Sequence, residues 1–190
     1  MATKPLPSPE LLRKLLRYDP ETGILTWKWR DKAWFLVESS RRRWNTRFAG
    51  KEALTAIDVG GRGYKHGSIT VLGLNKAYAH RVAYTIYHGD FPEFGIDHIN
   101  GDPTDNRIAN LRDVSQKINS RNSSRRKNNT SGVTGVYWNN QMERWCAQIT
   151  VDGRTKSLGL FASLDLAIYA RKEAEAGHDF HANHGRIPII

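Results

Sequence analysis

The stretch Ile96–Ser120 reads IDHINGDPTDNRIANLRDVSQKINS, and its polar side chains decide how the first half of the chain is interpreted. Asp97 and His98 are adjacent, and a segment rich in Asn, Gly, Asp and Pro separates them from Asn110. Such a segment predicts a turn-rich loop. A helical pattern follows Asp113, and Asn119 lies within it. We therefore expect an acid, an imidazole and two amides to be held around one loop and one helix.

These four side chains suit the hydrolysis of a phosphodiester. That reaction needs a nucleophile and stabilisation of the charge on the phosphate and the leaving oxygen, which a hard divalent cation supplies. The Asp97 carboxylate and the Asn119 amide oxygen are ligands that Mg²⁺ accepts, with positions left for water and phosphate. The His98 imidazole, with an unperturbed pKa of about 6.5, keeps a useful neutral fraction as a base near neutral pH.

The pattern resembles the HNH endonucleases. Their ββα-metal site carries an acid and a histidine on a first strand, an asparagine before or on the second strand, and a His or Asn on the helix. The resemblance implies that His98 is the general base, that Asp97 and Asn119 hold the metal, and that Asn110 braces the hairpin loop through backbone hydrogen bonds. Many relatives have a third histidine where this chain has Asn119, which places it in the H-N-N subgroup that includes some phage homing endonucleases.

These roles set a geometric condition on the first strand. A lone Asp-His pair is most often an ordinary pair at the edge of a turn, and only the full pattern favours a nuclease. Adjacent strand residues point to opposite faces, so Asp97 and His98 can reach one phosphate only if the strand bends. Gly95 before the pair and Asn100-Gly101 after it are residues that permit a bend.

Other acids and histidines receive structural roles. Asp102 and Asp105 lack the alternating ligands and central glycine of an EF-hand loop, so we assign them to turns and caps. For His80, a packed or hydrogen-bonded histidine is favoured over a direct catalytic function. Three histidines near the C-terminal end could bind a metal adventitiously, but a solvated tail is favoured; they are His178, His181 and His184.

The charge of the chain favours a polyanionic partner. The formal net charge is +10, from 29 Lys and Arg against 19 acidic residues. Such a charge favours binding to nucleic acid through contacts with phosphates and the release of counterions. The alternative is that the charge only keeps the protein soluble. The single cysteine, Cys146, excludes a disulfide framework and a zinc ribbon. No apolar run approaches the length of about 20 residues that spans a bilayer, and Met1–Glu10 lacks a secretory signal.

Upstream of the quoted stretch, the sequence predicts short elements. They are a helix over Pro9–Arg17, a strand over Ile24–Trp29, a hairpin of strands Ser68–Leu72 and Ala77–Ala79, and a helix over His80–His88 that ends at Gly89. The region from 27 to 51 mixes tryptophans with basic residues. It suits either a nucleic-acid surface or a small core with a basic rim, and both interpretations stay open.

The segment Ser120–Ser131 reads SRNSSRRKNNTS and has no acid and no large apolar side chain. It cannot bury a core, so we expect a linker between two modules. Its basic residues favour a strap that lies along DNA, with a solvated tether as the alternative. The residues concerned are Arg121, Arg125, Arg126 and Lys127.

Three strands and a helix are predicted after the linker. The strands are Gly135–Trp138, Arg144–Val151 and Thr155–Phe161, and Ser163 is a suitable N-cap for the helix that follows. This segment is similar to the AP2 DNA-binding domain, in which a three-stranded sheet lies in the major groove with a helix packed behind it. Its landmarks are Gly135-Val136-Tyr137-Trp138, Trp145 with Ala147 and Ile149, and Leu158-Gly159 with Phe161.

Period-two alternation separates two faces of the middle strand. Trp145, Ala147, Ile149 and Val151 form the face expected to meet the helix. The polar face is expected to meet DNA, with Tyr137, Asn139, Arg144, Gln148, Thr150 and Lys156 as candidate contacts. The plant domains have more arginine at the corresponding positions, so base specificity does not carry over, and a purely structural sheet is the alternative.

We therefore predict an α+β chain with an N-terminal HNH ββα-metal nuclease module and a C-terminal three-stranded antiparallel sheet packed on one helix. The predicted boundaries are 1–122 for the nuclease module, with its core at about 95–122, then 123–131 for the linker and 132–190 for the AP2-like domain. The expected activity is Mg²⁺- or Mn²⁺-dependent nicking or cutting of double-stranded DNA by a phage-borne enzyme of the homing type, in the cytoplasm of a bacterial host cell.

No membrane and no small-molecule cofactor are expected, and a monomer is favoured with a dimer left open. The alternatives are a non-catalytic AP2-like regulator with a decayed nuclease module, and a structure-specific RNA or DNA binder.

Overall fold

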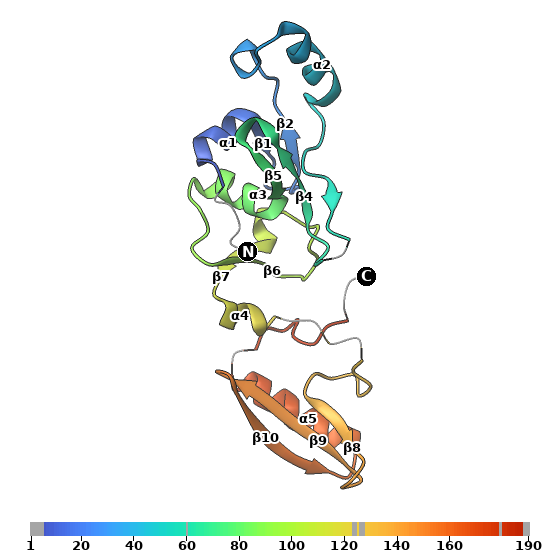
Figure 1. Ribbon diagram of the computed structural model, residues 1–190. Helices are drawn as coiled ribbons and strands as arrows, with labels where there is room; N and C mark the ends of the chain where they lie inside the picture. Colours follow the sequence, from blue (N-terminus) through green and yellow to red (C-terminus); the bar gives the residue numbers. More distant parts are fainter. Residues whose placement is uncertain (1–5, 60, 123–124, 126–127, 179, 188–190) are drawn as a thin grey trace. The chain divides into compact units, whose positions relative to one another are not determined.

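The computed structural model describes residues 6–59, 61–122, 125, 128–178 and 180–187 (Figure 1). The chain divides into two compact units, Met1–Val114 and Ser115–Ile190. The division falls before the helix that carries Asn119, whereas the sequence placed the end of the first module at residue 122. Among the described residues, none of the helices has the length and apolar character that crossing a membrane requires.

The first unit consists of short helices and three small antiparallel sheets, paired as β1-β2, β3-β4-β5 and β6-β7. Its elements are α1 (Pro9–Leu15), β1 (Leu16–Tyr18), β2 (Leu25–Trp27), α2 (Glu38–Phe48), β3 (Ala56–Ile57), β4 (Lys65–Ile69), β5 (Leu74–Tyr78), α3 (Ala79–His88), β6 (Gly95–His98) and β7 (Leu111–Val114). Short 3₁₀ helices lie at Lys32–Trp34, Thr70–Leu72 and Ile108–Asn110.

The helix α3 connects the main core of this unit to the β6-β7 hairpin. On one side Val82 is completely buried in the core that α1, β1, β2 and β5 share. On another side Ala83 packs against Ile96 of β6 and Leu111 of β7. Gly89 ends the helix with a φ of +77°, a left-handed conformation that glycine adopts without strain. The helix predicted from the sequence at His80–His88 is confirmed, and it fixes the position of the hairpin.

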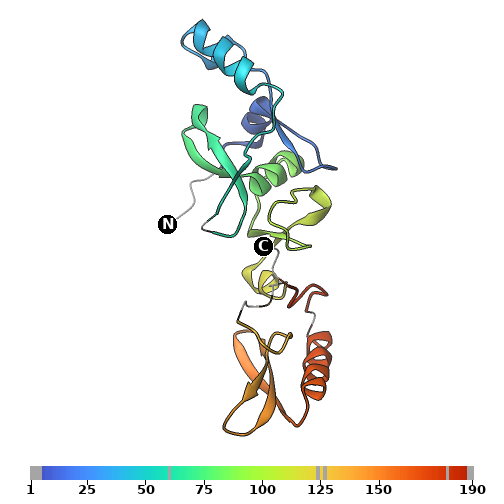
Figure 2. The same cartoon turned by 90° about the vertical axis from the view of Figure 1, so that its right-hand side faces the viewer.

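Three predictions for the first unit need correction. The first helix ends at Leu15 and not at Arg17, because Leu16 already pairs with Trp27 in the β1-β2 sheet. The strand expected at Ser68–Leu72 occurs earlier as β4, and Thr70–Leu72 forms a 3₁₀ turn instead. The helix α2 was not predicted, and Figures 1 and 2 show it apart from α1 and α3.

The tryptophan-rich region is partly a small core. Trp44 of α2 packs edge-on against Trp27 with ring centroids 5.7 Å apart, and Phe48 lies 5.4 Å from Trp44. The Arg30 guanidinium stacks over Trp44 at 3.7 Å, a cation–π contact. Trp29, in contrast, is 65% exposed. The core interpretation therefore applies to the packed rings, while Trp29 stays available at the surface.

The second unit begins with α4 (Gln116–Ser120) and continues with β8 (Val136–Asn139), β9 (Arg144–Val151), β10 (Arg154–Phe161) and α5 (Leu164–Ala176). The strands form one antiparallel sheet in the order β10-β9-β8, and α5 covers one face of it (Figures 1 and 2). Val136, Ala147 and Ala167 form the buried core between the sheet and the helix. The predicted mixed helix-and-sheet fold and the C-terminal three-stranded sheet are confirmed.

His181 and His184, near the C-terminal end, are held by contacts with the rest of the second unit. His184 is only 8% exposed, and its Nε2 atom lies 3.2 Å from Nη2 of Arg171, which is itself buried on α5. The backbone N–H of His181 donates to the carbonyl oxygen of Arg121. The solvated tail expected from the sequence is therefore wrong for these two histidines, because a buried arginine requires polar partners.

Candidate active site

The β6-β7 hairpin places Asp97 and His98 on opposite faces. Asp97 is opposite Arg112, and His98 is opposite Leu111, with no register shift from Gly95 to His98. Directly opposed residues share a face, and consecutive residues alternate between faces. The pairing with β7 continues through His98 without a register shift, so no β-bulge in this strand supplies the bend that the sequence interpretation required.

Asp97 forms an ion pair with its cross-strand neighbour. Both Nε and Nη2 of Arg112 donate to Oδ2 of Asp97, at 3.0 and 2.8 Å. The side chains are 9% exposed for Asp97 and 27% exposed for Arg112, so the pair is better shielded from water than a typical surface pair. A cation that binds this carboxylate must share it with the guanidinium or displace the guanidinium.

His98 lies on the face of the hairpin that α3 covers, and it is only 4% exposed. Its Nε2 atom lies 3.2 Å from Oδ1 of Asn106, which is also buried. Its ring stacks on Tyr64 with centroids 5.7 Å apart. Burial lowers the pKa of His98 below its ordinary value, while the hydrogen bond to Asn106 and the charge of Asp97 act in the opposite direction. The neutral imidazole is therefore favoured near neutral pH.

Asn110 joins the two ends of the loop between the strands. Its Oδ1 accepts a hydrogen bond from the backbone N–H of Asn100 at 2.9 Å, and its Nδ2 donates to the carbonyl oxygen of Asp105 at 2.8 Å. The residue is 7% exposed. These are the backbone hydrogen bonds that the family resemblance implies for Asn110.

The two loop acids have the structural roles that the sequence predicted. Asp102 accepts hydrogen bonds from both the backbone N–H and the hydroxyl of Thr104, each at 2.8 Å. Asp105 pairs with Arg107 through two nitrogens and accepts a further bond from the side chain of Asn100. Both carboxylates are therefore used to order the turn.

His80 enters the site from the first turn of α3. It is 6% exposed, and its ring centroid lies 4.5 Å from that of Tyr64 and 5.3 Å from that of His98. Its Nδ1 atom is buried and has no hydrogen-bond partner within the part of the chain that the structure describes. Burial, with a smaller effect from His98, lowers the pKa of His80 to about 3. His80 is thus a packed histidine, as the sequence interpretation favoured.

Asn119 lies on α4, in the second unit, and is half-buried, so its pairing with Asp97 stays a prediction. Among the residues described, no group of three or more His, Cys, Asp or Glu side chains is arranged to hold a metal. The carboxylate and amide oxygens proposed here are hard donors, and Mg²⁺ on phosphate substrates commonly uses only one or two carboxylates plus substrate oxygens and water. The donor set fits that kind of site and not a closed zinc site.

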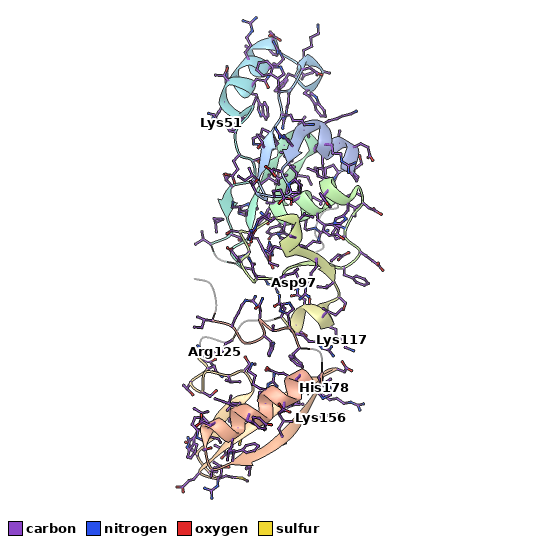
Figure 3. The ribbon with its side chains drawn as sticks, turned by 180° about the vertical axis from the view of Figure 1, so that it is seen from behind. Lys51, Asp97, Lys117, Arg125, Lys156 and His178 are labelled. Carbon is purple, nitrogen blue, oxygen red and sulfur yellow. The ribbon has the colours of Figure 1, made fainter. Side chains whose placement is uncertain are left out.

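The sheet register divides the candidate DNA contacts of the second unit. Thr150 and Thr155 are opposite each other, and their hydroxyls lie 2.9 Å apart on the face away from α5. Lys156, labelled in Figure 3, is opposite Ile149, which is buried on the α5 side. The register therefore puts Lys156 on the other face of the sheet from Gln148, and its contact with DNA stays a prediction.

The other candidate DNA contacts differ in the hydrogen bonds that they already make within the protein. Asn139 accepts bonds from the backbone N–H groups of Gln141 and Met142, so it orders the β8-β9 turn. Arg125 donates to the carbonyl oxygen of Gly132 at 2.7 Å. Arg126 and Lys127 lie outside the described residues. Exposed or half-buried side chains on the polar face are Tyr137, Arg144, Gln148 and Thr150.

Sequence reasoning missed three residues of the hairpin site. They are Asn106, Arg112 and Tyr64. Asn106 occupies an ordinary position in a loop full of similar residues, and Tyr64 is distant in sequence from the hairpin. Arg112 could have been found, because pairing the residues on either side of the loop as an antiparallel hairpin places Arg112 opposite Asp97.

The comparisons with known proteins address this same segment. Residues 77–121 match the HNH endonuclease family. This HNH segment, residues 77–121, contains Asp97, His98, Asn110 and Asn119. The chain is also 38% identical over 80 residues to "Protein 3.8" of Escherichia phage T7. That alignment covers 42% of this chain and 64% of the relative, so the chain spans less than two thirds of the relative's length.

The relative's name does not describe an activity. No solved structure matches the chain. The match supports a domain of the nuclease type at residues 77–121, and the AP2-like assignment of residues 132–190 stays a prediction.

Proposed function

We propose that this chain is a divalent-metal-dependent endonuclease that hydrolyses phosphodiester bonds in double-stranded DNA. The observation that carries the proposal is the HNH segment, in which all four residues implied by the family pattern are present. The Asn110 brace and the buried, oriented His98 support it. The phage relative is consistent with a phage-borne enzyme of the homing type.

His98 acts as the general base in this proposal. The amide oxygen of Asn106 can only accept a hydrogen bond, so Nε2 carries the proton of the neutral imidazole. The basic nitrogen is then Nδ1. Because burial lowers the pKa of His98, the ring is neutral at physiological pH and can take a proton from the attacking water.

Asp97 and Asn119 are the proposed ligands of Mg²⁺ or Mn²⁺. When bound, the cation would stabilise the charge that develops on the phosphate and the leaving oxygen. Arg112 holds the Asp97 carboxylate in the metal-free protein and neutralises it. Asn110 keeps the loop closed, so that the end of the strand that carries both residues is ordered before DNA arrives.

The second module supplies affinity for DNA in this proposal. The polar face of its sheet carries Tyr137, Gln148 and Thr150, side chains that contact phosphates or base edges in other complexes. The formal net charge of +10 adds a general attraction to the DNA backbone. Its similarity to the AP2 domain is the reason to expect this role.

One observation favours a second function, that of a non-catalytic DNA-binding regulator. The Asp97 carboxylate is already paired with Arg112, and Asp97 and His98 leave opposite faces of β6. A nuclease that has lost its activity would tolerate both features. Binding to DNA would then be retained without any cleavage.

Cleavage of supercoiled plasmid separates the two functions. The nuclease proposal predicts that the wild-type protein cuts with Mg²⁺ and not with EDTA, and that His98→Ala loses cutting while it still binds duplex DNA. His88→Ala is the matched control, because His88 is exposed at the end of α3. Binding without cleavage by the wild-type protein, with Mg²⁺ and with Mn²⁺, would refute the nuclease and support the regulator.

The number of strands that are cut is a further outcome. One ββα site acts on one strand at a time, so a monomer is expected to give a nicked circle before any linear product. Linear plasmid without a nicked precursor, from a protein shown to be a monomer, would contradict this part of the proposal.

A further inference from the structure

A groove in the second unit lies between α4 and the polar face of the sheet. It has a volume of about 1020 Å³. Lys117 and Arg121 of the α4 region line one side, and Gln148 and Thr150 of β9 line the other, with Asp152 at the end of the sheet. The groove combines cations, amides and hydroxyls, the groups that contact the backbone of a nucleic acid.

A single carboxylate engages the two cations that the α4 region contributes to this groove. Lys117 Nζ lies 2.7 Å from Oδ1 of Asp152, and Arg121 Nη2 lies 3.8 Å from the same oxygen. Asp152 stands in the tight turn between β9 and β10, where it and Gly153 have φ values of +53° and +76°. These values are typical of a two-residue hairpin turn, so the backbone that carries the carboxylate is well defined.

The helix α4 has two distinct sides. Lys117 and Arg121 are four residues apart and lie on the same side, toward Asp152. Asn119 stands between them in sequence and, at about 100° per residue, on the opposite side. The side that pairs with the sheet is therefore separate from the side that carries the proposed metal ligand.

The polar side chains of the groove suit an anionic ligand. Lys117 and Arg121 supply positive charge, and Gln148 and Thr150 supply an amide and a hydroxyl. A phosphodiester complements this set, because its oxygens accept hydrogen bonds and carry the negative charge that the cations attract.

We propose that this groove binds the phosphodiester backbone of a DNA strand, and that Asp152 occupies the phosphate position in the DNA-free protein. The proposal rests on the proposed function, since it names a surface by which the nuclease holds its substrate. Asp152 competes with DNA for Lys117 and Arg121, and its departure frees both cations for phosphate. The contact to be displaced is weak, because the side chains of Lys117 and Asp152 are 59% and 57% exposed.

The test is the affinity of the full chain for a short fluorescein-labelled duplex, measured by anisotropy across a range of salt concentrations. EDTA is present throughout, so that binding is measured without cleavage. Asp152→Asn should bind about two- to fivefold more tightly at low salt, the range expected for loss of one exposed ion pair. The slope of log affinity against log salt should steepen by about one to two, since each freed cation can contact a phosphate. Asparagine tolerates a positive φ, so the turn is kept.

Two controls separate this mechanism from a change in net charge. Glu173→Gln adds the same charge at an exposed position of α5 and should give a smaller gain with no change in slope. Replacing Lys117 and Arg121 by glutamine in the Asp152→Asn background should remove the gain, because the competing groups are then absent. Circular dichroism of each variant checks that the fold is kept.

Equal effects of Asp152→Asn and Glu173→Gln would overturn the proposal, as would weaker binding by Asp152→Asn. Retention of the full gain after removal of Lys117 and Arg121 would overturn it as well. None of these results depends on cleavage. If the protein does not cleave DNA but shows the expected changes in binding, the groove proposal stands. If it cleaves DNA but does not show these changes, the groove proposal fails.

Discussion

His80 offers a sharp test of how the hairpin site is packed, through the change His80→Phe. The histidine is buried, its Nδ1 lacks a partner among the described residues, and its pKa is lowered to about 3. Phenylalanine keeps a ring against Tyr64 and Tyr78 and removes both the buried polar atom and the site of protonation. We expect the variant to be as stable as the wild type at neutral pH, or more stable.

The effect should appear on acidification. A histidine whose pKa is lowered in the folded state binds a proton in the unfolded state alone, so its contribution to stability falls as the pH drops below the unfolded pKa of about 6.5. For a folded pKa of about 3, the loss between about pH 7 and about pH 5 is about 2 kcal/mol. His80→Phe should lack this loss.

Urea unfolding followed by tryptophan fluorescence, with EDTA present, measures the free energy of unfolding at both pH values. His98 is present in both proteins, so the difference between them reports His80. His88→Phe is the control on the same helix, at an exposed position, and should behave as the wild type does. If His80→Phe loses as much stability on acidification as the wild type, the described environment of His80 is wrong.

Three further outcomes are expected. Asn110→Ala should lower the free energy of unfolding by about 2 to 3 kcal/mol in urea, because two backbone groups of the loop lose their partner, and it should abolish plasmid cleavage; a stable, active variant would contradict the brace. Arg112→Met should lower the Mg²⁺ concentration needed for half-maximal cleavage, since Asp97 no longer shares its carboxylate; a higher requirement would show that Arg112 assists the metal. The cleavage rate should fall on acidification only below about pH 6.5, because the pKa of His98 is lowered. A rate that already falls above that pH would contradict the role of His98 as the base.

The C-terminal sheet and helix were predictable almost residue by residue. Alternation in Arg144–Val151 gave the middle strand with its observed bounds, and Ser163 caps α5 through a bond from the N–H of Leu166. Both signals are local, so one sequence is enough to see them. The face of Lys156 was not predictable, because it depends on the register between β9 and β10 and on the bulge between Ser157 and Gly159.

In the first unit, Met1–Val114, less of the structure was predictable from local sequence signals. The residues Asp97, His98 and Asn110 were found from their pattern, yet the ring that stacks on His98, Tyr64, comes from a distant position in the sequence. The helix α2 escaped notice because its sequence ESSRRRWNTRF is mostly polar and lacks an apolar stripe. It is held partly by Asn45, whose side chain is buried and bonds to the backbone of Arg30 in both directions.

The division of the chain between Val114 and Ser115 cuts through the HNH segment, since α4 belongs to the second unit. A recombination event at this point would carry Asn119 along with the three-stranded sheet that follows it. A crossover within the basic stretch 123–131 would instead break the link between Lys117 and Asp152. Under the proposed function, a chimeric protein joined before Ser115 would inherit the proposed metal ligand Asn119 together with the sheet that follows it.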